Sequence, residues 1–256
     1  MQKSLQNSIN ESNKQMKKLL LTLMALAATM SIDAQMIKVY EGDQLVLKYR
    51  VVNSGKVVFE EAPPTTGTAY AEEPDCEIGW VQLWEDGLKF AVCNVGAKNN
   101  EPEDSGGYYT WGGTYKNGTG IEWNGAYNTG TVALEGENDT ATKLWGKNWR
   151  MMTTEEFGEL TNNKNCTCTW ATRNGVEGLL CKGKEGTAFA ANSVFLPAAG
   201  YNSSGVSSQG RKGYYWSSTP SPVNSGDACY LNFGSDRSFD GAMPRGWGFS
   251  VRAVLK

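Results

Sequence analysis

The 256-residue chain contains no histidine. Since histidine is the general base of Ser-His-Asp and Cys-His catalysis and a common metal ligand, its absence excludes those catalytic sites and every His-ligated metal site. The chain also has no excess of positive charge, because 24 Lys and Arg face 27 Asp and Glu, for a net charge of −3. Nucleic-acid binding needs concentrated positive charge, so we expect no nucleic-acid partner. These absences argue against most hydrolase chemistry.

The sequence lacks an apolar run long enough to span a membrane, which needs about 20 residues. The run at residues 19–30 is shorter, follows two lysines and is followed by the small residue Ala34. This order is typical of a secretory signal peptide. We therefore predict that residues 1–34 are removed, with translation starting at Met1 or Met16, and that no transmembrane span remains. The protein would be exported to the periplasm, the outer surface or the medium. The alternative is a buried core helix.

None of the six cysteines forms a C-x-x-C pair, which argues against zinc-ribbon and thioredoxin-type sites. The cysteines are Cys76, Cys93, Cys166, Cys168, Cys181 and Cys229. None directly follows the apolar run, so a lipid anchor is not expected there.

One disulfide can be predicted from a hairpin. Asn174-Gly175 is a strong signal for a type I′ turn, which needs positive φ at both central residues. A two-residue turn there places Cys168 opposite Cys181 at a non-hydrogen-bonded position, where Cα atoms lie about 4.5 Å apart. A disulfide can span that distance. A bulge at Gly178 would shift this register, and free buried thiols are the alternative.

The mature chain has two unequal parts. Residues 35–61 are predicted to be a small β-hairpin module, because apolar and polar residues alternate as in two strands, with runs at 37–40 and 45–49 and then at 57–59. Residues 62–70 are rich in Pro, Gly and Thr and are predicted to be a linker. The larger part, 71–256, contains all nine tryptophans and alternates short strand-like runs with Gly, Asn and Ser loops. Few helices and many short strands predict an α+β fold.

One helix has a clear start signal. Thr153 is followed three residues later by Glu156, which is the pattern of a capping box. Phe157 and Leu160 lie three residues apart and can bury one face of this helix.

Five ordered motifs give the larger part a resemblance to a known family. They are DGLKFAVCNVGA with GYYTWG at 86–97 and 107–112, WGKNWRM at 145–151, FLPAAGY at 195–201, GYYWSS at 213–218 and GFSVRAV at 248–254. In this order they resemble the Fibrobacter succinogenes major paralogous domain over residues 86–254. Met152 departs from the proline usual in that family. The module at 37–59 also resembles a short N-terminal module fused to exported proteins of gut Bacteroidetes.

The resemblance implies a C-type-lectin-like fold, with two helices, small twisted antiparallel sheets and long loops. The same fold hosts formylglycine-generating sulfatase activators and variable receptor proteins, whose C-terminal portion forms the ligand face. Function must still be argued from the site, because one fold hosts many activities. Six tryptophans in or near the motifs are interpreted as core anchors: Trp80, Trp84, Trp111, Trp145, Trp149 and Trp216.

The most site-like stretch is 224–247. Its strand 228–233 alternates, so we expect Leu231 and Phe233 to face the core with Cys229, and Tyr230 and Asn232 to face outward. The mixture of aromatic and forked polar groups suits sugar hydroxyls or a peptide surface. The predicted ligand-binding residues are Tyr230, Asn232, Ser235, Asp236, Arg237, Asp240, Arg245 and Trp247. A solvated loop with Trp247 in the core is the alternative.

Two acidic stretches supply the oxygen ligands that Ca²⁺ prefers, although neither has a recognisable ligand spacing. They are residues 101–104 and the group Glu135, Glu137, Asn138 and Asp139. We predict no cofactor, with Ca²⁺ as the alternative.

The sequence therefore predicts an exported, non-catalytic binding protein, with carbohydrate as the favoured ligand and a cell-surface protein partner second. A structural or adhesin-tip role is the next alternative. An enzyme resembling the sulfatase activators is third, because Cys229 would have to act as a reactive thiol although its strand position predicts an inert or bridged one.

Overall fold

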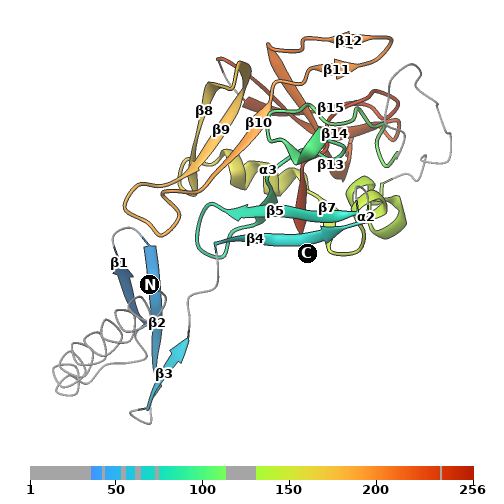
Figure 1. Cartoon of the computed structure of the whole chain (residues 1–256). Coiled ribbons are helices and arrows are strands. Elements are labelled where there is room, and N and C mark those ends of the chain that lie inside the picture. The colour runs from blue at the N-terminus through green and yellow to red at the C-terminus, as the bar shows by residue number, and fades with distance from the viewer. Residues whose placement is uncertain are drawn as a thin grey trace. The chain divides into compact units, whose positions relative to one another are not determined.

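A computed structural model describes residues 36–41, 44–52, 56–60, 65–72, 75–113, 131–236 and 238–256 (Figure 1). Side chains are described from residue 65 onward, except at 238–240. The predicted signal peptide, 1–34, lies outside the described residues, so its cleavage stays a prediction. Within the described ranges, no helix is long and apolar enough to cross a membrane.

The N-terminal module is a three-stranded sheet with strand order β1-β2-β3. Its strands are β1 (Met36–Glu41), β2 (Gln44–Val52) and β3 (Lys56–Glu60). Strands β2 and β3 pair antiparallel, with Val51 opposite Val57. The strand-like runs at 37–40, 45–49 and 57–59 are all strands, so the module is a three-stranded sheet rather than the predicted two-stranded hairpin.

The predicted linker is shorter than expected, because β4 (Thr66–Ala71) occupies most of it. This strand pairs along its whole length with β5 (Cys76–Gln82), from Thr66 opposite Val81 to Ala71 opposite Cys76. Gly67 counted as a linker signal, yet a Cβ there would lie 2.7 Å from the ring of Trp80. The glycine makes room for the indole, so β4 is a paired strand of a sheet rather than part of a linker.

In its described residues, the larger unit is mostly small antiparallel sheets with two helices, which agrees with the α+β prediction (Figure 1). The described helices are α2 (Thr140–Trp145) and α3 (Thr154–Thr161), with 3-10 turns η1 (Lys98–Asn100) and η3 (Gly136–Asn138). The remaining strands are β6 (Lys89–Ala91), β7 (Trp149–Met151), β8 (Cys166–Arg173), β9 (Val176–Gly183), β10 (Ser193–Pro197), β11 (Tyr201–Asn202), β12 (Val206–Ser207), β13 (Lys212–Pro220), β14 (Asp227–Gly234), β15 (Ser238–Pro244) and β16 (Ala253–Leu255).

The largest sheet brings the end of the chain to its interior. Its order is β4-β5-β6-β16-β7, so the last strand pairs with β6 on one side and β7 on the other. Val254 lies opposite both Phe90 and Arg150. The other sheets of this unit are β10-β9-β8, β11-β12 and β13-β14-β15.

The predicted capping box is confirmed at the start of α3. The Thr153 hydroxyl accepts a hydrogen bond from the Glu156 amide at 3.3 Å, and Glu156 Oε2 accepts one from the Thr153 amide at 2.9 Å. Glu156 also receives two hydrogen bonds from the Arg150 guanidinium, at 2.6 and 2.5 Å. Phe157 and Leu160 are fully buried, so the helix buries the predicted face.

The predicted hairpin and disulfide are also confirmed. Strands β8 and β9 keep the expected register, with Arg173 opposite Val176 and Cys168 opposite Cys181, and no shift at Gly178. Asn174 and Gly175 both have positive φ, 48° and 80°. Cys168 and Cys181 form a disulfide across a Cα–Cα distance of 4.0 Å.

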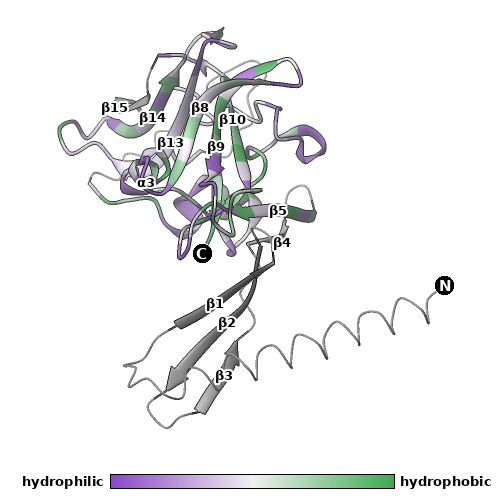
Figure 2. Cartoon of the chain, turned by 90° about the vertical axis from the view of Figure 1, so that its left-hand side faces the viewer, coloured by the Kyte–Doolittle hydropathy of each residue, from purple (hydrophilic) through white to green (hydrophobic). Residues whose placement is uncertain are grey.

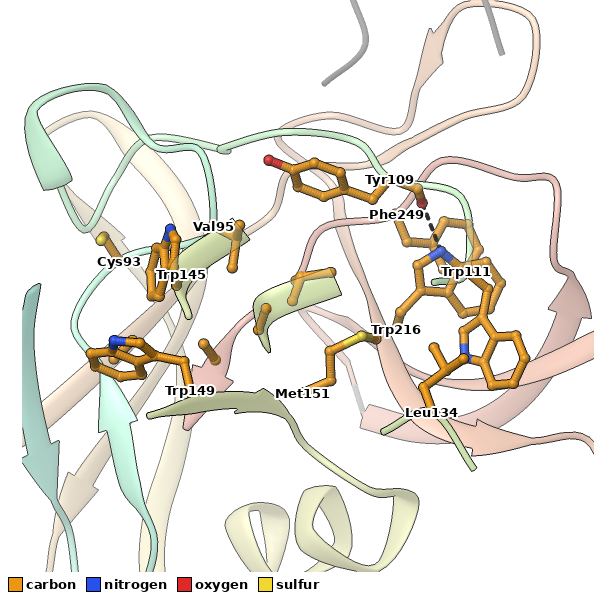
Figure 3. Close-up of a cluster of buried hydrophobic side chains, with 14 of the residues drawn as sticks. Cys93, Val95, Tyr109, Trp111, Leu134, Trp145, Trp149, Met151, Trp216 and Phe249 are labelled. Carbon is orange, nitrogen blue, oxygen red and sulfur yellow. Dashed lines mark hydrogen bonds between the residues drawn. The ribbon is translucent and has the colours of Figure 1, made fainter. Parts of the chain in front are cut away.

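The buried hydrophobic residues form two clusters. Strand β13 contributes to both, because Tyr214 and Trp216 lie in the first cluster and Tyr215, on its other face, lies in the second. Figure 3 shows the first, where Trp145 packs edge-on against Trp149 and the indole of Trp216 donates a hydrogen bond to the Tyr109 carbonyl at 2.8 Å. In Figure 2, β10 is hydrophobic over most of its length, as a strand inside the core must be. Five of the six tryptophans predicted as anchors are buried, and Trp84 is half-buried: the five are Trp80, Trp111, Trp145, Trp149 and Trp216.

Candidate ligand-binding face

Strand β14 is buried on both faces, which corrects the expected orientation of Tyr230 and Asn232. Leu231 and Phe233 enter one hydrophobic cluster as expected, but Tyr230 enters the other and is only 5% exposed. Asn232 is 1% exposed and donates a hydrogen bond to the Gly213 carbonyl at 3.3 Å. The alternation was identified correctly, but β14 is a central strand between β13 and β15 with hydrophobic residues packed on both sides.

A row of aromatic rings leads from β14 to the surface. Tyr230 stacks on Tyr214 with ring centroids 5.8 Å apart, and Tyr214 meets Tyr201 edge-on at 5.0 Å. Tyr201 stacks on Trp247 at 5.1 Å with only 12° between the ring planes. Tyr214 and Tyr230 are buried, whereas Tyr201 and Trp247 are half-buried. We call these four residues the aromatic row.

Backbone pairing brings the outer end of the row together. Asn202 and Gly248 exchange two backbone hydrogen bonds, of 2.8 and 2.7 Å. Tyr201 and Trp247 directly precede these two residues, so the pairing makes them neighbours. A Cβ on Gly248 would lie 3.1 Å from that of Tyr108, so this close approach favours glycine. The row therefore depends on contacts between residues far apart in the sequence.

Glycine also makes room at the inner end of the row. Gly241 on β15 lies opposite Tyr230, and a Cβ there would come 2.9 Å from the tyrosine ring. The ring of Tyr230 consequently lies over the backbone of β15.

The two buried phenol groups of the row, those of Tyr214 and Tyr230, are neutral hydrogen-bonding groups. Burial raises the pKa of Tyr214, although a hydrogen bond with the Asn232 side chain opposes that shift. Burial also raises the pKa of Tyr230, with a smaller contribution from Tyr214. Both hydroxyls thus stay protonated at neutral pH and can donate as well as accept.

Arg245 is buried rather than presented to a ligand. It is 7% exposed, its guanidinium lies 4.2 Å from the Trp111 ring centroid, and its Nε donates to the Asp227 carbonyl at 2.9 Å. Burial lowers the pKa of Arg245, opposed by the negative charge of Asp227. The side chain holds the end of β15 against the core, and its sequence-based assignment to the ligand face is not supported by this burial.

Two other predicted residues, Ser235 and Asp236, lie at the end of the β14–β15 hairpin that is far from Trp247. Ser235 and Asp236 are exposed at its turn, while Trp247 follows the end of β15. A strand of eight residues separates these ends by about 25 Å. Arg237 and the side chain of Asp240 lie outside the described residues. The structure therefore does not bring the described members of the predicted set to one place.

The acidic stretches considered for Ca²⁺ have structural contacts. Glu103 pairs with Arg173 at 2.7 Å and accepts a hydrogen bond from the Asn174 side chain at 2.9 Å. Asp139 caps α2 by accepting from the Thr142 amide, and it also accepts from the Met151 amide, both at 2.8 Å. Burial raises the pKa of this carboxyl, and both hydrogen bonds oppose the shift.

Potential metal ligands converge elsewhere. In the part of the chain that the structure describes, the group of His, Cys, Asp and Glu side chains with ligand atoms close together consists of Cys166, Cys168 and Cys181. Cys229, the residue of the enzyme alternative, is half-buried, and its thiol donates to the Pro220 carbonyl at 3.5 Å.

Sequence reasoning missed Tyr201 and Tyr214 as members of a candidate site, because both lie inside motifs that were used only for the family resemblance. The segment after Tyr201, Asn-Ser-Ser-Gly, is a surface-loop composition that also occurs in binding loops rich in Tyr, Ser, Gly and Asn. A loop of this composition directly after Tyr201 was the sequence signal that could have identified this candidate site. Comparisons of the chain with protein-family models, with curated proteins and with solved structures gave no match.

Proposed function

We propose that this is an exported, non-catalytic binding protein that recognises carbohydrate at the outer end of the aromatic row, on a domain of the C-type-lectin-like class. The observation that carries the proposal is the half-buried stack of Tyr201 on Trp247. Both rings combine apolar area with a polar group, which is the combination that carbohydrate recognition requires.

The rigidity of the stack favours binding. Phe249, which is fully buried, lies 6.4 Å from Tyr201 and 6.3 Å from Trp247 between ring centroids. Rings held in this way lose little conformational freedom when a ligand covers them, so more of the contact energy appears as affinity. The C–H face of a sugar ring can pack on such a surface while its hydroxyls reach neighbouring polar groups.

Polar groups flank the stack. Asn202 is half-buried, and its Oδ1 accepts a hydrogen bond from the Gly205 amide at 3.1 Å, which orders the loop beside Tyr201. Ser203 is half-buried and Ser204 is exposed in that loop. Hydroxyl and amide side chains of this kind offer the directional hydrogen bonds that distinguish one sugar from another.

The family resemblance supports the same place on the fold. The motifs at 195–201, 213–218 and 248–254 contribute Tyr201, Tyr214 and Phe249 to the aromatic cluster. Export, the C-type-lectin-like class and the absence of catalysis are parts of the proposal, motivated by the leader at 1–34, by these motifs and by the lack of histidine.

The test is binding of the full-length protein to a mixed glycan array, with and without EDTA. We expect saturable binding that falls at least about tenfold in Trp247→Ala, because the stacking surface is removed. Asp236→Ala is the matched control, since this exposed residue lies at the other end of the hairpin, and it should bind like the wild type. Thermal unfolding of each variant checks that it is folded. Loss of binding in EDTA would indicate Ca²⁺.

Other outcomes would redirect the assignment. A folded protein that binds no glycan contradicts carbohydrate recognition and favours a protein partner or a structural, adhesin-tip role. Binding lost in Asp236→Ala but kept in Trp247→Ala would move the ligand to the β14–β15 turn. Thiol-dependent turnover abolished by Cys229→Ser would favour the sulfatase-activator alternative.

A further inference from the structure

Three cysteine sulfurs lie together between β8, β9 and α3. The Sγ atoms of Cys166, Cys168 and Cys181 all lie within 4.8 Å of one another, and those of Cys166 and Cys168 are 3.9 Å apart. Cys168 and Cys181 form the disulfide, while Cys166 is a free thiol. Cys166 and Cys181 are buried and Cys168 is half-buried.

The strand pattern accounts for this convergence. Cys166 and Cys168 are two residues apart on β8, so their side chains leave the same face of the sheet. Cys181 lies directly opposite Cys168 on β9. Above that face, the last turn of α3 directs the carbonyl oxygen of Leu160 at the sulfurs, 3.0 Å from Cys166 Sγ and 3.2 Å from Cys168 Sγ.

We propose that, when the Cys168–Cys181 disulfide is reduced, the thiolates of Cys166, Cys168 and Cys181 bind one soft divalent metal ion of the Zn²⁺ type, with the Leu160 carbonyl oxygen beside it as a fourth ligand. The metal-bound and disulfide forms are mutually exclusive, because the disulfide uses two of the three thiolates.

The sulfur spacing fits such an ion. In a tetrahedral zinc site with Zn–S bonds of about 2.3 Å, sulfur atoms lie about 3.8 Å apart. Cys166 and Cys168 already show a spacing of 3.9 Å. Breaking the disulfide lets the sulfurs of Cys168 and Cys181 separate toward the same distance without moving the strands, since their Cα atoms already face each other across the ladder.

The charges also fit a divalent cation. Three buried thiolates without a counter-ion would be strongly unfavourable, and burial raises the pKa of the Cys166 thiol to about 11. A divalent ion bound to three thiolates leaves one net negative charge. The Lys184 ammonium can offset that charge, since its positive charge lowers the pKa of Cys166, whereas burial raises it. The carbonyl end of α3 adds negative potential that attracts a metal ion.

The chemistry balances in two steps. A dithiol reduces the disulfide by transferring two electrons and two protons, which yields the Cys168 and Cys181 thiols, and the dithiol becomes a disulfide. The metal ion then displaces three protons from the three thiols as the three metal–sulfur bonds form.

The test is a Co²⁺ and Zn²⁺ titration of the full-length protein. The protein is first reduced with a phosphine, which becomes a phosphine oxide with oxygen from water and is then removed. We expect one Co²⁺ per chain with a thiolate-to-cobalt charge-transfer band that Zn²⁺ abolishes. The oxidised protein should show no such band. In Cys166→Ser, which keeps the disulfide, affinity after reduction should fall on the order of 100-fold.

Cys76→Ser is the matched control, because Cys76 is a free, half-buried thiol outside the cluster, and it should behave as the wild type. The proposal is overturned if the reduced wild type gives no band, if Cys166→Ser binds equally well, or if Cys76→Ser loses binding. If reduction unfolds the protein, Zn²⁺ should restore the folded state in the wild type and not in Cys166→Ser. If Zn²⁺ does not restore the folded state of the reduced wild type, the proposal is also overturned.

Discussion

Arg252 places a charged group in the centre of the larger unit. It is 1% exposed, and its guanidinium donates three hydrogen bonds, to Asn94 Oδ1 at 2.9 Å, the Ala91 carbonyl at 2.8 Å and the Phe195 carbonyl at 2.7 Å. All three acceptors are neutral, and burial lowers the pKa of Arg252. The planar guanidinium presents five donors in a fixed geometry, so it can satisfy several separate acceptors at once. One residue thereby joins β6, the loop after it and β10.

We predict that both Arg252→Lys and Arg252→Met destabilise the protein. A lysine ammonium cannot reach all three acceptors, and methionine leaves every one of them unpaired at about 1–3 kcal/mol each. Urea denaturation should show a loss of about 3 kcal/mol or more for Arg252→Met. Arg211→Met, at an exposed position, is the control and should change little. Equal stability of wild type and Arg252→Met would refute this account.

At the scale of elements, the β8–β9 hairpin and α3 form from local signals that tertiary packing then uses. The Asn174-Gly175 turn sets a register that puts Cys168 opposite Cys181. The capping box begins α3 at the residue that lets Phe157 and Leu160 face the core. Each element contains a glycine in open space, and these glycines have opposite roles.

We predict that Gly175→Ala destabilises the protein and Gly158→Ala stabilises it. Neither glycine would bring a Cβ within 4 Å of another atom, so packing does not distinguish them. Gly175 has a φ of 80°, which costs a non-glycine residue about 1–2 kcal/mol. Gly158 lies inside α3, where alanine is favoured by about 0.5–1 kcal/mol. Free energies of unfolding under oxidising conditions should differ in these directions. Changes of the same sign would contradict this explanation.

At the scale of the whole molecule, the larger unit is completed by its last strand. β16 lies between β6 and β7 in the five-stranded sheet, so neither neighbour has its full set of backbone partners until the end of the chain is in place. Val254, at its centre, is fully buried.

Val254→Asp should therefore prevent stable folding of the larger unit, because an unpaired carboxylate in the core costs several kcal/mol against a typical total stability of about 5–15 kcal/mol. We expect loss of the near-UV circular dichroism of the buried tryptophans. Val223→Asp tests the same substitution at a side chain that is 94% exposed, and its spectrum should match the wild type. A native spectrum for Val254→Asp would show that β16 is dispensable.

The sequence by itself determined the features that depend only on residues close together along the chain. The α+β class, the capping box at Thr153, the turn at Asn174-Gly175 and the Cys168–Cys181 disulfide were all predictable, because turn geometry, capping and strand register act over a few residues. The buried tryptophans were predictable from their positions beside glycines in the motifs.

Tertiary structure alone decided what covers each face of an element. The alternation of β14 was readable, but not that both its faces are buried, so Tyr230 and Asn232 were placed at the surface when they lie inside. Arg245, beyond the end of β15, was misplaced in the same way, because it packs on the Trp111 ring. The same long-range packing stacked Tyr201 on Trp247 and placed the Leu160 carbonyl of α3 against the sulfurs of Cys166 and Cys168. A period of two residues tells which side chains share a face, and only the neighbouring strands and helices determine whether that face meets water.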